Sequence, residues 1–334
     1  MKITIKDVAR EANVSIATVS RVINGKDKVK EETRVKIMNA IEKLNFIPDY
    51  NARTMVQKKT KMIGFMPPEL ANGYWSELSD VIQHDLWKKG YALLVTSHNM
   101  EEDKIISILD LFLERNVDGI IFGPLAKKKN EKISNSIEHL LNRDVPIVTL
   151  QGTSIQGVTS VDVDNRGGAM SVVQYLLDSG RQQIAFVGTV NSSREREFGY
   201  RNALMINHMP INEEIIILAD YNGDFTTFGY NAAYKLVESK QKFNAIFCGN
   251  DLIAYGVIRA LKELGIAIPE DVSIVGFDDI SASSLRSPML TTIKQPIKEI
   301  GSTVVDVLLE QMESGKKTIT KKIVLPTELM IRET

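Results

Sequence analysis

Short apolar runs alternate with amphipathic stretches along residues 62–334, and this alternation limits the chain to a few folds. The runs are rich in Val, Ile and Phe, as strands that are covered on both faces tend to be. Stretches with helical periodicity, such as 77–89 and 104–115, separate them. Repeated strand–helix–strand units predict parallel sheets covered by helices. The expected strands are MIGFM (62–66), YALLVTS (91–97), VDGIIFG (117–123), VPIVTL (145–150), QIAFVG (183–188), AIFCG (245–249) and VSIVGF (272–277).

A break in the spacing near residue 162 predicts two such units rather than one large sheet. The chain of 334 residues is long enough for two or three packed cores. No apolar run approaches the length of a bilayer span, and the polar start at Met1 is unlike a signal peptide. The single cysteine, Cys248, excludes an internal disulfide. We therefore expect a cytoplasmic protein with no membrane partner.

The charge is unevenly distributed, although the net charge is only −1. Residues 1–62 carry 14 basic and 7 acidic side chains, whereas the remaining residues carry 27 basic and 35 acidic ones. A basic head joined to an acidic body suits contact with nucleic acid, but a basic stretch can also be an ordinary solvated face. Charge alone does not decide between the two.

The head has the pattern of three short helices. Thr4, with Asp7 three residues later, forms an N-cap pair that opens a first helix. Ser15 can cap a second helix over 15–24. Three short helices with a tight turn between the first two form a helix-turn-helix, whose second helix lies in the DNA major groove. The third helix is indicated by the spacing of Ile37, Ile41 and Leu44 and ends before Pro48.

The second helix has an apolar stripe, made by Val14, Val19, Val22 and Ile23, and a second face. On that face small hydroxyl side chains suit phosphates, and Arg21 is long enough to reach base edges. The alternative is a helical bundle whose polar side chains simply face solvent. Small residues favour DNA contact, because a free helix surface would normally carry Lys or Glu. The face consists of Ser15, Ile16, Ala17, Thr18, Ser20, Arg21 and Asn24.

The head motifs TIKDVAREANVSIATVSRVING and TRVKIMNAIEKLNFIPDYNAR closely resemble the lactose/galactose repressor family of bacterial transcription regulators. The likeness continues in family order through VDGIIFGP, VDVDNRGGA, GNDLIAYGVIRALKELGIAIPEDVSIVGFDDI, LTTIKQP and LPTELMIRET. The resemblance implies an all-α helix-turn-helix head and an α/β body with two Rossmann-like, parallel-sheet subdomains of periplasmic-binding-protein type. It implies a repressor of carbohydrate uptake or utilisation genes that binds a palindromic operator as a homodimer and responds to a small sugar or sugar derivative.

The resemblance also implies how the chain is divided. The chain ends without the leucine-rich helix of the family's tetramers, which favours a dimer. The body would consist of two subdomains between which the chain crosses three times. The implied parts are a DNA-binding domain (1–47), a linker that becomes a hinge helix on operator (48–61), and an effector-binding and dimerisation domain (62–334), with an N-subdomain (about 62–162 and 294–324) and a C-subdomain (about 163–293 and 325–334).

The implied hinge departs from the family at one position. Relatives typically have a leucine that wedges between the central base pairs of the operator, whereas this chain has Met55. Without the resemblance, the segment would be interpreted as a basic linker. The DNA contacts implied for the head and hinge are Thr4, Ser15, Ile16, Ala17, Thr18, Ser20, Arg21, Asn24, Thr33, Asn51, Ala52, Arg53 and Met55.

Motif matching implies effector contacts in a cleft at the carboxyl ends of the strands. Aromatic platforms combined with Arg, Asn and Asp side chains suit hydroxyl-rich rings. As an alternative, the aromatic rings could be plain core, and Asn250 and Asp278 could be turn or cap residues. The implied contacts are Tyr74, Trp75, Ser192, Arg196, Phe225, Asn250, Asp278 and Gln295.

The charge of the implied site bears on its ligand. Gln151 stands where the family often has Asp, which makes an acidic or phosphorylated sugar more credible beside Arg196 and Arg194. A neutral saccharide remains the default. Inducers and co-repressors both occur in the family, and we favour an inducer.

An enzyme is the other class that the body could belong to. The glycine patterns GxGxxG and GxxxxGK[ST] of nucleotide-binding loops are missing, and the four histidines lack metal-ligand spacing. The segment DVDNRGG begins like a calcium loop, but Arg166 occupies a ligand position, so we expect a strand end that runs into a helix. We expect no catalytic residue, metal or cofactor. The alternative function is a sugar-binding or sugar-processing protein whose basic head is incidental.

Overall fold

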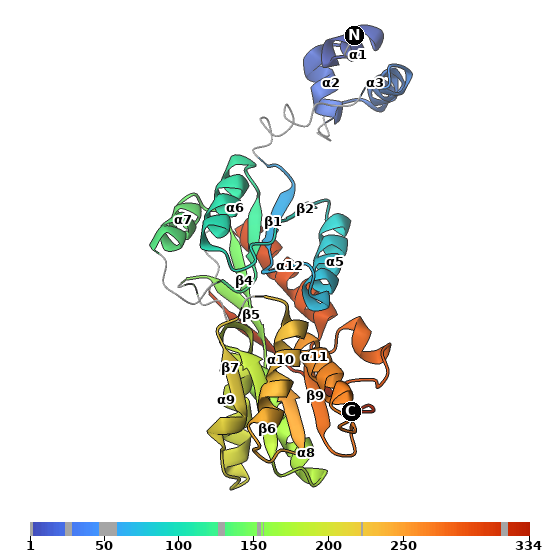
Figure 1. Ribbon diagram of the computed structural model, residues 1–334. Helices are drawn as coiled ribbons and strands as arrows, with labels where there is room; N and C mark the ends of the chain where they lie inside the picture. The colour runs from blue at the N-terminus through green and yellow to red at the C-terminus, as the bar shows by residue number, and fades with distance from the viewer. Residues whose placement is uncertain are drawn as a thin grey trace. The chain divides into compact units, whose positions relative to one another are not determined.

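The chain forms two compact units, Met1–Thr60 and Lys61–Thr334 (Figure 1). The described part of the first unit is helical, and the second unit contains sheets covered by helices. The computed structural model describes residues 3–23, 29–46, 59–125, 131–151, 155, 157–221, 223–314 and 320–334.

The first unit packs three helices around a small apolar core. Val8, Val19 and Ile37, one from each helix, are fully buried. The predicted N-cap pair is confirmed, because the Asp7 carboxylate accepts the backbone N–H of Thr4 at 2.9 Å and its hydroxyl at 2.7 Å. The three predicted helices are confirmed as α1 (Ile5–Glu11), α2 (Ile16–Ile23) and α3 (Glu31–Lys43).

The second unit contains two six-stranded sheets. The first has the strand order β11-β5-β4-β3-β1-β2 and is parallel throughout. The second has the order β12-β10-β9-β8-β6-β7. The strands are β1 (Met62–Met66), β2 (Ala92–Val95), β3 (Gly119–Phe122), β4 (Ile147–Leu150), β5 (Thr159–Val163), β6 (Ile184–Thr189), β7 (Ile216–Ala219), β8 (Ala245–Cys248), β9 (Ser273–Asp278), β10 (Thr291–Lys294), β11 (Lys322–Leu325) and β12 (Glu328–Met330).

The seven predicted strands are all present, and two parallel-dominated sheets confirm the predicted fold class. One pair of strands departs from the parallel pattern, because β12 runs antiparallel to β10 at the edge of the second sheet. β12 follows β11 directly from the first sheet and enters the second sheet from the side of the cleft, where the other strands end, so it runs against them. Four strands were not predicted. β7, β11 and β12 have no buried residue, and β10 is a short run of largely polar residues, TTIK.

Helices cover both faces of each sheet (Figure 1). In the first sheet α5 packs with α12 on one face, and α6 packs with α7 on the other. In the second sheet α10 packs with α11 on one face, and α8 packs with α9 on the other. The helices are α5 (Gly73–Lys88), α6 (Glu102–Glu114), α7 (Glu131–Asn142), α8 (Asn165–Asp178), α9 (Val190–Ile206), α10 (Phe225–Glu238), α11 (Asp251–Glu263) and α12 (Ile297–Ser314), with short 3₁₀ turns η1 (Glu213–Ile215) and η2 (Ser281–Ser284).

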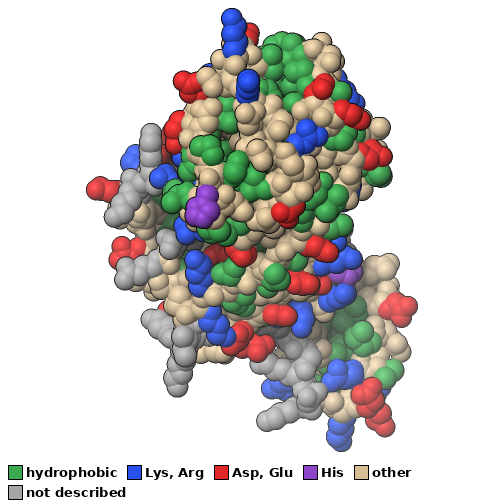
Figure 2. All heavy atoms as spheres, turned by 90° about the horizontal axis from the view of Figure 1, so that it is seen from below, with side chains coloured by type: hydrophobic (Ala, Val, Ile, Leu, Met, Phe, Trp, Pro, Cys, Tyr) green, Lys and Arg blue, Asp and Glu red, His purple; other side chains and the backbone are tan. Residues whose placement is uncertain are grey.

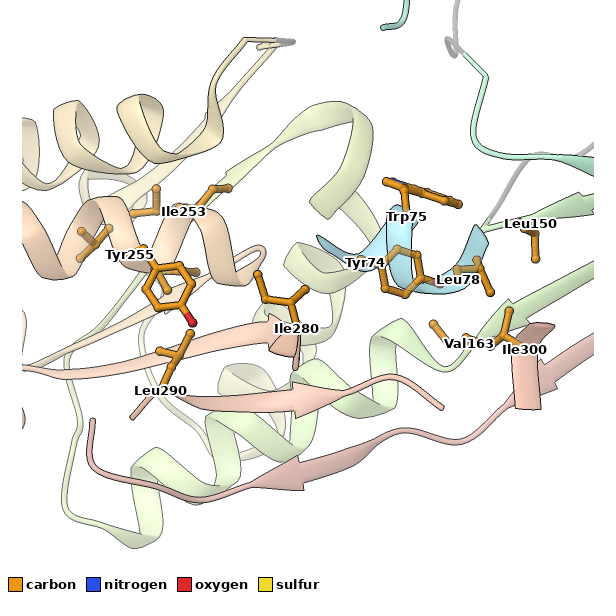
Figure 3. Packing of buried hydrophobic residues seen from close by; sticks show 14 of the residues in the cluster. Tyr74, Trp75, Leu78, Leu150, Val163, Ile253, Tyr255, Ile280, Leu290 and Ile300 are labelled. Carbon is orange, nitrogen blue, oxygen red and sulfur yellow. The ribbon is translucent and has the colours of Figure 1, made fainter. Parts of the chain in front are cut away.

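The chain passes from one sheet to the other after β5, after β10 and after β11. One apolar cluster joins the α5–α12 face of the first sheet to the α10–α11 face of the second. Figure 3 shows Ile280 in the middle of this cluster, between Tyr255 on one side and Tyr74 on the other. The two subdomains, each a sheet with its covering helices and here also called layers, therefore share a core on this side. The carboxyl ends of the strands in both sheets face a common cleft.

Candidate functional site

The exposed face of α2 is one candidate site. Val19 and Val22 are buried against the other helices, whereas Ile16 is 45% exposed although it is apolar. Ser15, Ala17 and Arg21 are exposed on the same face, and Thr18 and Ser20 are partly buried. The division of this helix into a buried stripe and a free face is therefore confirmed.

The basic side chains of the head differ in how they are paired. Arg10, Arg34 and Lys43 each lie within 4 Å of an acidic side chain, whereas Arg21 makes no ion pair with any described residue. An unpaired guanidinium on an exposed helix face can donate to a base edge or a phosphate without losing an internal partner.

Three hydroxyl groups predicted to contact DNA also have structural partners. The Thr4 hydroxyl donates to Asp7, and the Ser15 hydroxyl accepts the backbone N–H of Thr18 at 3.1 Å and lies 2.8 Å from its hydroxyl. Thr33 is partly buried in the first turn of α3. The other predicted DNA contacts, Asn24, Asn51, Ala52, Arg53 and Met55, lie outside the described residues.

A cleft of about 1330 Å³ in the body is the second candidate site. Its walls come from segments that follow strands of both sheets, so the carboxyl ends of the strands position its side chains. Six of the eight predicted effector contacts line it: Tyr74, Trp75, Arg196, Phe225, Asn250 and Asp278. Gln295 contacts Asp278 from behind the wall, and the side chain of Ser192 lies outside the described residues.

Arg196 is held at the base of the cleft by several partners at once. Its Nη2 lies 3.1 Å from Oδ1 of Asp278, and its Nε donates to Asn165 at 2.8 Å. Another N–H donates to the carbonyl oxygen of Gly249, and the guanidinium carbon lies 3.7 Å from the centre of the Phe277 ring. The orientation of this arginine is therefore fixed before any ligand arrives.

A chain of hydrogen bonds links Asp278 to the other sheet. Gln295 donates from Nε2 to Asp278 at 2.6 Å, and its own Oε1 accepts from Gln151 at 3.2 Å. Burial raises the pKa of Asp278, and the charge of Arg196 opposes part of that rise. Gln151, the residue that departs from the family pattern, thus contributes a neutral amide to this network.

The aromatic residues Tyr74 and Trp75 are part of the apolar core and also line the cleft. Tyr74 and Trp75 are 2% and 5% exposed and pack edge to face at 5.0 Å between ring centres. The Tyr74 hydroxyl is buried beside the Gln151 side chain, but within the described residues it makes no hydrogen bond of good geometry. Burial raises the pKa of this hydroxyl, so it stays protonated and can donate to a ligand.

Asn250 has both of the roles that its sequence position allows, since it caps a helix and also lines the cleft. Its Oδ1 accepts the backbone N–H of Ile253 at 2.8 Å and so caps α11. Its side chain lines the cleft as well. The segment DVDNRGG is the end of β5 followed by α8, with Asp164 as the N-cap, which confirms a strand running into a helix.

Acidic side chains predominate around the cleft, with seven among its lining residues against four basic ones. Glu69 and Asp224 face the cleft from different layers, and burial together with the charge of Asp224 raises the pKa of Glu69. Elsewhere the surface has mixed charge: on the face drawn in Figure 2, Lys and Arg side chains are interspersed with Asp and Glu.

Some residues of the cleft were missed from the sequence. Asn165, Phe277 and Gly249 hold Arg196, and Asp162 lines the wall at the end of β5. The only signal was their position at strand ends, which does not say which side chain faces a ligand. Within the described residues, no three His, Cys, Asp or Glu side chains are arranged to hold a metal ion. No described helix is long and apolar enough to cross a membrane.

Comparisons with known proteins cover the head and the body. The family described as bacterial regulatory proteins of the lacI family matches residues 4–49. The periplasmic binding protein-like domain matches residues 173–334. Catabolite control protein A of Priestia megaterium is 35% identical over 339 aligned residues, which cover 100% of this chain and 99% of that protein.

Two solved structures extend the comparison. The lac repressor dimer bound to operator and the anti-inducer ONPF has a TM-score of 0.88 and 28% identity, with 100% of this chain and 99% of that chain covered. A transcriptional regulator of the same family from Enterococcus faecium, solved with bound ribose, has a TM-score of 0.72 and 28% identity, with 81% and 97% covered.

Proposed function

This chain belongs to the lacI family of bacterial regulatory proteins, and on that premise we propose how its head and its cleft work together as a sugar-responsive repressor. It is a DNA-binding transcription regulator, and its relatives are regulators rather than enzymes. The observation that carries the proposal is the Arg196–Asp278 pair, which lies in a cleft of the same chain whose Arg21 is exposed on α2 and makes no ion pair with any described residue. We place its action in the cytoplasm, where bacterial DNA is.

The head, residues 1–47, reads the operator through α2. Arg21 contacts a base edge, while the hydroxyl groups of Ser15, Thr18 and Ser20 contact phosphates. Residues 48–61 form the hinge in the minor groove. The protein binds an imperfect palindrome as a homodimer, since two identical heads read two half-sites. Sedimentation at micromolar concentration should give a dimer, and a monomer or a stable tetramer would contradict this assignment.

The body, residues 62–334, binds the effector between its two subdomains. We propose a neutral sugar or sugar derivative rather than an acidic or phosphorylated one, because acidic side chains outnumber basic ones around the cleft. From the sequence, Gln151 made an acidic ligand more credible, and the acidic lining of the cleft argues against that ligand. Trp75 and Phe225 supply apolar ring faces, and Asp278, Arg196 and Asn250 supply polar groups.

A gel-shift experiment tests the proposal. Full-length protein is titrated into a panel of imperfect palindromes, with neutral sugars, sugar phosphates or no addition. We expect one palindrome to bind far more tightly than random DNA, and one neutral sugar to shift that binding by about 5- to 150-fold, the usual range of coupling between two sites.

The alternative function makes a different prediction in the same experiment. A sugar-binding protein with an incidental basic head would bind all DNA alike, with affinity set by salt alone. Equal binding to palindromes and random DNA, combined with sugar binding, would therefore support the alternative. A response to sugar phosphates only would overturn the assignment of a neutral ligand.

A further inference from the structure

Four consecutive residues, beginning with the last residue of β9, contact four different parts of the protein. Asp278 lines the cleft, and Asp279 pairs with the C-terminal segment. Ile280 packs in the apolar cluster that joins the two layers. Ser281 contacts Glu77 on α5, a helix of the first layer. Asp278 in the cleft is therefore only three residues away from a contact with α5 in the other subdomain, and a shift of Asp278 can be transmitted to that helix.

The contact between Glu77 and Ser281 is a cap supplied from another subdomain. Oε1 of Glu77 accepts the backbone N–H of Ser281 at 3.0 Å and its hydroxyl at 2.8 Å. Ser281 is the first residue of η2, and the first N–H groups of a helical turn have no partner inside that turn. Glu77 thus accepts the backbone N–H of Ser281, for which the helical turn of Ser281 itself provides no acceptor.

Asp251 holds the same loop firmly to the second sheet. Its Oδ2 accepts the backbone N–H of Ile280 at 3.0 Å and the hydroxyl of Ser283 at 2.7 Å. Its Oδ1 accepts the hydroxyl of Thr292 on β10. Because residues on both sides of Ser281 are anchored in this way, the loop moves with its subdomain rather than independently of it.

On the other side, Glu77 is rigidly linked to the cleft through α5. Trp75, two residues earlier, lines the cleft and is 5% exposed. Gly73, one turn before Glu77, lies so close to the loop that an added Cβ would sit 3.3 Å from Cβ of Ile280. Both ends of the Glu77–Ser281 contact therefore belong to rigid pieces that also form the walls of the cleft.

We propose that Glu77 is a positioning residue that clamps the two subdomains together through Ser281 and so sets the opening of the effector cleft. It does so without touching the effector. The proposal rests on the function proposed above, because it assigns regulation to the same cleft. Breaking the clamp should favour open forms of the cleft and weaken effector binding by about three- to tenfold, as expected for one hydrogen-bonded carboxylate that is partly exposed to solvent.

The two tryptophans of the chain allow a test that needs neither effector nor DNA. Trp87 is 74% exposed, so Trp87→Phe leaves the buried Trp75 as the only reporter. Acrylamide quenching of Trp75 fluorescence then measures how open the cleft is. We expect Glu77→Ala to raise the quenching constant several-fold over that of the Trp87→Phe parent.

Three companion variants make the result specific. Glu77→Gln keeps an oxygen that accepts both donors, so it should behave like the parent. Adding Ser281→Ala to Glu77→Ala should change nothing further, because the hydroxyl has already lost its partner. Asp80→Ala removes an exposed carboxylate from the same helix and should leave quenching unchanged.

Equal quenching for Glu77→Ala and Asp80→Ala would overturn the proposal, as would a Glu77→Gln variant that opens the cleft as much as Glu77→Ala does. Circular dichroism on each variant checks that it is folded. Operator binding by the same proteins separates the two proposals: if no palindrome is bound but Glu77→Ala still raises quenching, the repressor function fails and the clamp stands.

Discussion

Arg196 and Asp278 form an ion pair at the base of the cleft, with 3.1 Å between Nη2 and Oδ1 and both side chains at least nine-tenths buried. Removing one partner would leave the other charge buried and unpaired, which costs much more than the pair itself contributes. The pair is thus an internal constraint on the empty cleft as well as a candidate contact for the effector.

We expect the two single alanine variants, Arg196→Ala and Asp278→Ala, each to lower the free energy of unfolding by about 3–5 kcal/mol. The double variant should cost less than the sum of the two, because no unpaired charge remains. Urea unfolding of all four proteins measures this coupling. Strictly additive losses would show that the pair does not act as a unit.

Tyr74→Phe should raise the free energy of unfolding of the empty protein by about 1 kcal/mol, because it removes a buried hydroxyl that makes no hydrogen bond of good geometry within the described residues. The same change should weaken effector binding, because the phenylalanine ring has no hydroxyl to donate to the effector. Urea unfolding and an effector titration test the two effects separately. A variant that is less stable and binds the effector normally would mean that the hydroxyl serves the fold, not the site.

The protein should become less stable relative to Asp251→Asn as the pH rises from about 4 to 8. Burial raises the pKa of Asp251 to about 8, with the charge of Asp278 adding to the shift. The folded state therefore favours the protonated acid, and this contribution is complete below the ordinary pKa near 4 and is lost as the pH rises through 8.

The asparagine variant is a matched control, because its amide oxygen can still accept from Ile280 and Ser283. The difference between the two unfolding free energies should change by up to about 1.4 kcal/mol per pH unit. Parallel pH profiles for the two proteins would contradict a raised pKa of Asp251 in the folded state.

Arg21→Ala should weaken binding to the cognate operator by about 1–3 kcal/mol and relax specificity at one base pair. Lys59→Ala, which removes an exposed cation from the implied hinge segment, should weaken binding to all sequences alike. Anisotropy titrations on cognate and random DNA at one salt concentration compare the variants. Equal losses on both DNAs for Arg21→Ala would exclude base reading by this residue.

The sequence predicts the frame of this protein well, because strands covered on both faces and capped helices leave local signals. The strand containing Ile246 is such a case, and so is the cap at Thr4. Partly exposed strands such as β11 and β12 leave weak signals, since neither contains a buried residue. Their order in the sheets follows from the chain crossing between layers, which no local pattern specifies.

The site is predicted less completely. Arg196 and Asp278 were identified by family motifs, but they lie 82 residues apart in sequence, and they pair only because α9 and β9 meet in space. The contact between Glu77 and Ser281 gives no sequence signal, because both are common surface residues. Long-range hydrogen bonds of this kind become visible only when the two layers are seen together.

The central claim is that the cleft controls the head, and operator affinity with and without the active neutral sugar tests it most directly. Arg196→Ala and Asp278→Ala should keep operator affinity within a few fold of the parent protein when no sugar is present, and both should lose the response to sugar. Circular dichroism at the assay temperature confirms that each variant is folded. If both variants still respond at the effector concentration that switches the parent protein, the cleft is not the regulatory site.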